Sequence, residues 1–213
     1  MIVFQGQNDD KLPYVYPIFS NQNPGSLFHQ AMFGMTVPDM SSDKKSSIYF
    51  FSFMQYMAYM KANFYKLPDV CKLLLDSESH PAQAKGIYYR LDTDPRVSVA
   101  DKYLWESKKG FLLGNACLAR FSASDLKDDL LETGDKPIVV ASILVKTGNY
   151  FAHDYEFGIG MEWSEENAQC IRSGKYPGQN LLGKSLEWAR NFLRNDKHLK
   201  FFKPSVDDPS NEE

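Results

Sequence analysis

The chain has 213 residues, of which 43% are hydrophobic and 24% are charged, and its 27 acidic and 24 basic residues give a net charge of -3. This length is enough for one domain with a buried core, and the composition is ordinary for a soluble globular protein. The net negative charge gives no support for broad binding to nucleic acids or anionic membranes, although a local basic pocket is compatible with it.

Cysteine spacing, histidine spacing and hydropathy exclude further classes of protein. The three cysteines form no CxxC pair, and the four histidines do not have the spacing of metal ligands. We therefore expect no disulfide framework, no metal and no cofactor. No apolar run approaches the roughly 18 residues that a membrane-spanning helix needs, so the sequence predicts a cytoplasmic protein without membrane contact.

The first part of the chain combines a short strand with a long amphipathic helix. An apolar run at residues 2–4 indicates the strand, and a loop rich in Asn, Pro and Gly follows it. Apolar residues then recur at helical spacing over residues 53–64: Phe53, Met57, Met60 and Phe64. A second face of this helix carries Met54, Ala58 and Lys61 and could line a pocket.

Start and stop residues predict helices along much of the remaining sequence. Pro68, Pro81 and Ser98 are typical of helix starts, and Gly134 and Gly174 are typical of helix ends. The predicted helices cover residues 68–76, 81–90, 98–120, a segment that starts at Ser122 or Ser124 and stops at Gly134, 164–174 and 180–194.

One continuous apolar segment, residues 137–145, is predicted to be a strand buried on both faces. Together these elements predict an α+β fold that is predominantly helical and has a small buried sheet. We expect one domain over residues 1–200. Residues 201–213 are acidic and have little to bury, so they are predicted to form a disordered tail.

The last third of the chain places an acid, an aromatic ring and several glycines before a predicted helix. The two segments concerned are Asp154-Tyr-Glu-Phe157-Gly158-Ile-Gly160 and Gly178-Gln-Asn180-Leu-Leu-Gly183-Lys184. Free N–H groups at a helix start attract phosphate, especially where glycines let a ligand come close. The pattern therefore predicts a pocket for a phosphorylated sugar.

Several motifs, taken in order, resemble those of the NADAR family and span about residues 4–190. They are Ser52-Phe-Met54-Gln-Tyr56-Met-Ala-Tyr-Met-Lys61-Ala, Pro81-Ala-Gln-Ala-Lys85, Trp105, Ala119-Arg120-Phe121, Leu131-Glu-Thr133-Gly134, the Asp154 segment and the Gly178 segment. The resemblance implies a compact, mostly helical α+β fold. It also implies hydrolysis of an N-glycosidic bond to a ribose phosphate, since proteins of this family are similar in cleaving riboflavin-pathway intermediates or in removing ADP-ribose from guanine.

The chain departs from the family pattern at three positions. Met54 stands where the family places the glutamate usually credited with catalysis. Phe157 replaces a tryptophan, which keeps an aromatic ring but loses the indole donor. Arg120 replaces a lysine, which keeps the charge and changes its geometry.

The acid that would act in place of the missing glutamate has more than one candidate. Cleavage of an N-glycosidic bond develops positive charge on the sugar, so a carboxylate is needed nearby. Asp154 keeps the family's loop position and is the leading candidate, with capping of the adjacent turn as the alternative. Glu156 or Glu162 could supply a relocated acid, and a solvated side chain is the alternative for Glu156.

Each candidate for ligand binding also has a structural alternative. Lys61 either contacts a ribose phosphate or lies at the rim of its helix, and Asn180 either binds the ligand or caps a helix. Trp105 either stacks on a base or packs in the core. The predicted substrate-binding residues are Asn21, Lys61, Trp105, Phe157, Gly158, Gly160, Asn180, Gly183 and Lys184.

Two functions fit this sequence, and both have a small-molecule partner, a ribose phosphate or an ADP-ribosyl compound. The first is an N-glycosidase, a hydrolase that cleaves the N-glycosidic bond of a phosphorylated riboside. The second is a catalytically impaired protein that binds or sequesters such a ligand, because Met54 carries no charge. A third reading, an interaction scaffold, rests only on the aromatic content and the acidic tail, and the oligomeric state stays open.

Overall fold

The structure is a computed structural model, and it describes residues 1–5, 33–38, 47–76, 81–122, 126–141, 145–147, 150–152 and 154–195. The described elements are β1 (Ile2–Gln5), β2 (Phe33–Pro38), β3 (Ser47–Ser52), α3 (Phe53–Phe64), α4 (Pro68–Asp76), α5 (Pro81–Arg90), the 3-10 turn η1 (Leu91–Thr93), α6 (Val99–Ser122), α7 (Leu126–Glu132), β4 (Ile138–Ala141), β5 (Val145–Thr147), β6 (Tyr150–Ala152), α8 (Ala168–Arg172) and α9 (Leu181–Asn195). The predicted α+β fold, predominantly helical, is confirmed. Asn21 and the predicted tail at 201–213 lie outside the described residues.

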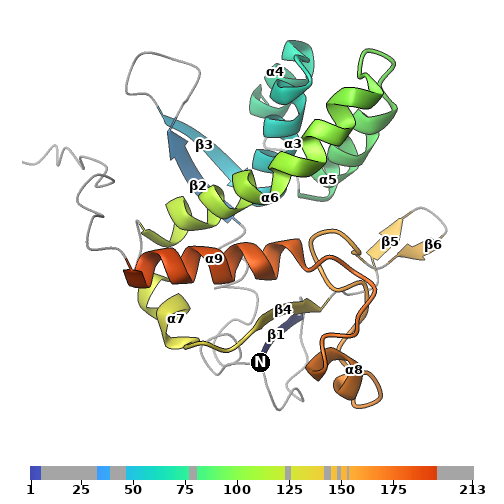
Figure 1. Cartoon of the computed structure of the whole chain (residues 1–213). Coiled ribbons are helices and arrows are strands. Elements are labelled where there is room, and N and C mark those ends of the chain that lie inside the picture. The colour runs from blue at the N-terminus through green and yellow to red at the C-terminus, as the bar shows by residue number, and fades with distance from the viewer. Residues whose placement is uncertain are drawn as a thin grey trace, which may run out of the picture.

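The two longest helices, α6 and α9, cross the middle of the molecule (Figure 1). Helices α3, α4 and α5 lie on one side of this pair, and strands β1 and β4 lie on the other. Helix α9 packs against both α6 and β4, so it connects the helical and the strand layers. In the described parts of the chain, no helix combines the length and hydropathy that crossing a membrane requires.

The predicted strands β1 and β4 form a parallel pair, with Ile2 opposite Ile138. Strand β4 is buried on both faces, as expected: Ile138 and Val140 belong to the main core, and Val139 packs in a second cluster with Ile171 of α8. The predicted segment 137–145 is nevertheless divided, because β4 ends at Ala141 and the separate strand β5 pairs with β6. A third pair, β2 with β3, is antiparallel.

Most helix starts and ends follow the residues that predicted them, with two differences. Helix α6 continues to Ser122, so Ser122 ends that helix and does not begin the next one, and α7 is confined to Leu126–Glu132. The amide of Asp101 donates to Ser98 Oγ at 3.1 Å, and the amide of Ser98 donates to the Asp101 carboxylate at 3.3 Å, so the predicted capping box opens α6. Helix α8 is shorter than predicted, because Ser164 Oγ accepts the amide of Asn167 in a turn that precedes the helix. Gly174, with a φ of 72°, follows the end of α8 as expected.

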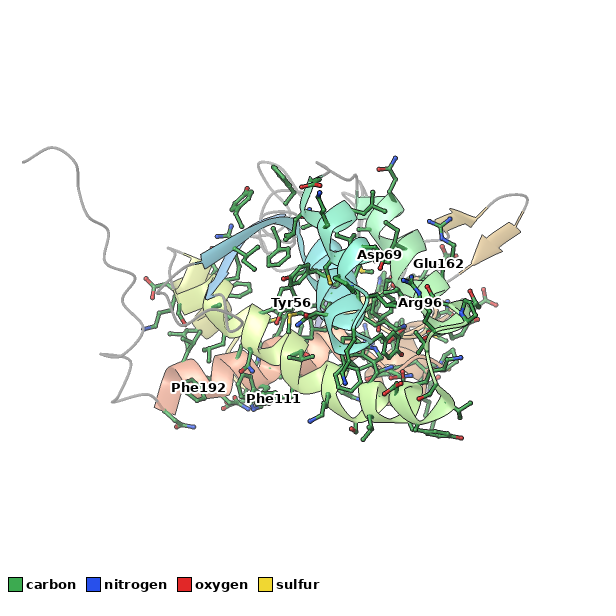
Figure 2. All side chains as sticks on the ribbon, turned by 90° about the horizontal axis from the view of Figure 1, so that it is seen from above. Tyr56, Asp69, Arg96, Phe111, Glu162 and Phe192 are labelled. Atoms are coloured by element: carbon green, nitrogen blue, oxygen red, sulfur yellow. The ribbon has the colours of Figure 1, made fainter. Side chains whose placement is uncertain are left out.

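Side-chain contacts fasten α3, α4 and the connection before α6 to one another. Gln55 of α3 donates from Nε2 to the carbonyl of Leu74 in α4 at 2.6 Å. Arg96, in the connection between α5 and α6, pairs with Asp69 of α4 at 2.9 Å and with Asp94 at 2.8 Å (Figure 2). These contacts set the positions of the helices that carry the charged residues described next.

Candidate functional site

A group of charged and aromatic side chains gathers where α3, α5, η1 and α6 meet the turn at residues 154–160. We call it the Glu156 cluster: Lys61, Tyr88, Tyr89, Asp92, Trp105, Lys109 and Glu156. Its residues come from segments that are far apart in the sequence. The fold therefore assembles the cluster.

Glu156 is the carboxylate on which the contacts of the cluster converge. Its Oε1 atom accepts the Tyr88 hydroxyl at 2.7 Å and Lys109 Nζ at 2.8 Å. Burial, followed by the negative charges of Asp154 and Glu156, raises the pKa of the neighbouring Tyr89. The Glu156 side chain keeps 16% of its surface exposed, so a ligand can approach it.

Lys109 supplies the positive charge beside Glu156. Its side chain is buried, and its ammonium group also pairs with Glu106, one turn earlier on α6, at 2.6 Å. Burial lowers the pKa of Lys109, but the hydrogen bonds to Glu106 and Glu156 outweigh burial and raise it above the ordinary value. Lys109 is therefore an ammonium ion at neutral pH.

Tyr88 connects Glu156 to the interior. Its hydroxyl accepts Trp105 Nε1 at 3.2 Å, and the ammonium of Lys61 lies 4.1 Å from the centre of its ring. Burial, followed by the negative charge of Glu156, raises the pKa of Tyr88, so the phenol stays neutral and continues to donate.

Lys61, predicted to contact a phosphate, is turned toward the protein. Its Nζ atom donates to the carbonyl of Tyr88 at 3.1 Å and to Asp92 at 2.7 Å, and only 2% of its side chain is exposed. Burial outweighs the pairing with Asp92 and lowers the pKa of Lys61. These contacts favour an organising role for Lys61 over direct contact with a ligand.

Asp154 holds the turn in which it lies. Its Oδ1 atom accepts the amides of Glu156 at 3.1 Å and Phe157 at 2.8 Å, and its Oδ2 atom pairs with Lys85 at 2.7 Å. The turn-capping alternative is thus realised, and both carboxylate oxygens have partners. The side chain remains 16% exposed.

The start of α9 was expected to bind phosphate, and the structure gives its N–H groups other partners. The amides of Leu181 and Leu182 donate to the carbonyls of Glu156 and Phe157, each at 3.1 Å. The amide of Asn180 donates to the carbonyl of Gly158 at 2.9 Å. The expectation of a phosphate at this terminus is wrong for these three groups, because the protein's own backbone occupies them.

The glycines of the two segments let the backbone, not a ligand, come close. A Cβ atom at Gly178 or Gly183 would lie closer than 3.0 Å to backbone atoms of Ile159 or Ile138, respectively. Gly160 has a φ of 72°, a conformation that side chains disfavour. Gly158 is buried in the same turn.

The Asn180 side chain is turned toward strand β4. Its Nδ2 atom donates to the carbonyl of Ile138 at 2.8 Å, and its Oδ1 atom accepts the amide of Val140 at 3.0 Å. The side chain is buried and completes the hydrogen bonding of β4. Its φ of 51° is unusual for a residue other than glycine.

The remaining predicted residues do not form an exposed stacking surface. Trp105 is fully buried, and Phe157, with 2% exposed, packs edge-on against Phe53. Met54 lies within the main hydrophobic core, whereas Lys184 is exposed on α9.

Sequence reasoning missed Tyr88, Tyr89 and Lys109. The available signal was helical spacing: Lys109 follows Trp105 by four residues, so both point to the same side of α6. Lys85 is the last residue of the motif at residues 81–85, to which the sequence assigned no role, and its ammonium group pairs with Asp154. Within the described residues, no three His, Cys, Asp or Glu side chains come together as metal ligands would.

The fold and the cluster define a small α+β protein whose ionised side chains meet beside a glycine-rich turn. A family model described as the NADAR domain matches residues 18–194, so the chain belongs to the NADAR family. The chain is similar to N-glycosidase R617 of Acanthamoeba polyphaga mimivirus, with 36% identity over 92 residues, which are 43% of this chain and 48% of that protein. The matched segment thus covers about half of that relative.

Proposed function

We propose that the protein is an N-glycosidase that hydrolyses the N-glycosidic bond between a base and the ribose of a phosphorylated riboside or of an ADP-ribosyl compound. Family membership and the N-glycosidase named above support this reaction type. The observation that carries the proposal is the partly exposed Glu156 carboxylate, held by phenol and ammonium donors. The substrate class follows from the family resemblance.

Glu156 suits the chemistry better than Asp154. Both Asp154 oxygens are bound to its own turn and to Lys85, so that side chain has little freedom to act on a substrate. The described hydrogen bonds of the Glu156 carboxylate come from side chains of other elements, Tyr88 and Lys109.

The reaction that Glu156 would support is a displacement at the anomeric carbon. The bond from C1′ to the base nitrogen breaks, its electron pair leaves with the base, and a water oxygen forms the new bond to C1′. The Glu156 carboxylate opposes the positive charge that develops on the sugar and accepts the proton that the water loses. The departing base takes up a proton from solvent.

The anionic part of the substrate would meet Lys85. Its side chain is 28% exposed, compared with 2% for Lys61, so Lys85 is the more accessible ammonium group at this site. Because Lys85 already pairs with Asp154, a phosphate would share it with that carboxylate.

The test is release of free base from two substrates, measured by mass spectrometry. The purified protein is incubated with the riboflavin-pathway aminopyrimidine ribose phosphate and with an ADP-ribosylated guanine nucleotide. We expect release from at least one of them, and a loss of about 100-fold or more in Glu156→Gln, the size typical of removing one group that stabilises transition-state charge.

Glu165→Gln is the matched control, because Glu165 is an exposed acid that follows the same turn in sequence and has no assigned role. It should release base at the wild-type rate. Saturable binding without release would instead support the sequestering function, and full activity in Glu156→Gln would return the role of the acid to Asp154.

A further inference from the structure

We propose that Lys109 is a positioning residue that supplies the positive charge beside the Glu156 carboxylate and holds this carboxylate in one orientation during the reaction. This inference rests on the proposed function and assigns a role to a residue outside the sequence motifs described above. In this chain the proposed catalytic acid, Glu156, lies on the turn at residues 154–160, and helix α3 carries no acid.

The first argument is geometric. Lys109 approaches Glu156 from α6 at 2.8 Å, with only 5% of its side chain exposed, so the pair is screened from water on the lysine side. Glu106 contacts the same ammonium at 2.6 Å and is 56% exposed, so it lies toward solvent. Lys109 thus stands between an outer and an inner carboxylate.

The second argument concerns the source of the charge. Helix α3 has no acid among residues 53–64, so the carboxylate assigned to the reaction, that of Glu156, comes from the turn. A carboxylate among buried aromatic side chains favours its protonated form unless a cation stands nearby. The phenols of Tyr88 and Tyr89 are neutral donors and supply no charge, whereas Lys109 does.

Other ionisable groups surround the pair, and none of them replaces Lys109. Lys61 forms its ion pair with Asp92, and Lys85 forms its ion pair with Asp154. The titratable groups that face the pair from the surrounding elements are Lys61 on α3, Lys85, Tyr88 and Tyr89 on α5, Asp92 on η1, Glu106 on α6, and Asp154 on the turn.

The experiment compares the pH dependence of kcat/KM in wild type, Lys109→Met and Lys109→Arg. An adjacent ammonium moves the protonation of a carboxylate by about 1 to 3 pH units. We therefore expect the acidic limb of the Lys109→Met profile to move up by about 1 unit or more, with kcat reduced more than KM is raised. Lys109→Arg should restore most of the shift.

Lys108→Met is the matched control, since Lys108 is an exposed lysine one position earlier on the same helix. Its profile should coincide with that of wild type. If Lys109→Met lowers kcat/KM equally at every pH, or not at all, Lys109 acts only in packing and the inference is wrong.

A second measurement does not depend on turnover. The 13Cε signal of Lys109 is followed by NMR against pH in wild type and in Glu156→Gln, and the signal is assigned by its loss in Lys109→Met. Because the Glu156 contact raises the pKa of Lys109, the Gln variant should lower it. An unchanged titration overturns the pair; a lowered pKa in a protein that releases no base supports the pair and refutes the proposed function alone.

Discussion

The turn from Asp154 to Gly160 separates two regions that are held together in opposite ways. On one side, partly exposed carboxylates contact ammonium and phenol groups from α5 and α6. On the other side, the five carbonyls of residues 155–159 accept the five amides of residues 178–182, and the two backbones lie in close contact. The first region is built from side chains and the second from main chain.

The comparison teaches where chemistry can occur. A glycine-rich segment before a helix attracts anions only if its N–H groups are free. Here those of Asn180, Leu181 and Leu182 have backbone partners, so the proposed function assigns binding and reaction to the side-chain region. Substitutions in the main-chain region should therefore affect folding, and those in the side-chain region should affect activity.

The largest effect is expected for Gly183→Ala. The new methyl group would lie closer than 3.0 Å to the carbonyl oxygen of Ile138 and to the Asn180 side chain, so α9 would have to move away from β4. Overpacking of this kind costs about 1 to 3 kcal/mol or more, and we expect a loss above about 3 kcal/mol because backbone is involved. Urea unfolding followed by circular dichroism measures it.

Gly86→Ala provides a control of opposite sign. Gly86 lies inside α5, and no atom would lie within 4 Å of an added Cβ there. Replacing glycine by alanine in a helix should then stabilise the protein by about 0.5 to 1 kcal/mol. If Gly183→Ala and Gly86→Ala changed the free energy of unfolding by similar amounts, α9 and β4 would not be in the close contact described.

Asn180→Ala should have the next largest effect, a loss of about 2 to 3 kcal/mol. It leaves the buried carbonyl of Ile138 and the amide of Val140 without their side-chain partner. It also places alanine at a φ of 51°. Asn180→Gly removes the second cost and should recover about 1 kcal/mol in the same unfolding assay, whereas equal stability of the two variants would contradict the role of φ.

Much of the fold could be predicted because local signals and packing agree. Pro68, Pro81 and the capping pair of Ser98 and Asp101 mark helices that the structure contains. The strand pair β5 and β6 was not predicted, since the apolar run 137–145 gives no sign of where one strand ends and the next begins.

The site could be predicted less well, and the reason is physical. The importance of residues 154–160 was visible in the sequence, but which partners their atoms would choose depends on tertiary contacts. Glycine spacing looks the same whether a ligand or a second backbone approaches. The role of Lys109 was not predicted, because an isolated lysine on a helix is usually solvated. Only the tertiary contact with Glu156 makes Lys109 part of an ion pair.

The smallest effect expected is a pH dependence of stability that distinguishes the two regions. Burial lowers the pKa of Lys61 in the folded state, so between this lowered pKa and the ordinary lysine value the unfolded chain binds more protons at this residue. The contribution of Lys61 to the free energy of unfolding therefore rises with pH in that range.

The free energies of unfolding of wild type, Lys61→Met and Asn180→Ala are measured at pH 7 and pH 9.5. Relative to Lys61→Met, wild type should be more stable at pH 9.5 than at pH 7. The difference in stability between wild type and Asn180→Ala should be the same at both pH values, because the hydrogen bonds of Asn180 involve no titrating group. A constant difference for Lys61→Met would mean that pairing with Asp92 compensates fully for burial, and the side-chain region would then be as insensitive to pH as the main-chain region.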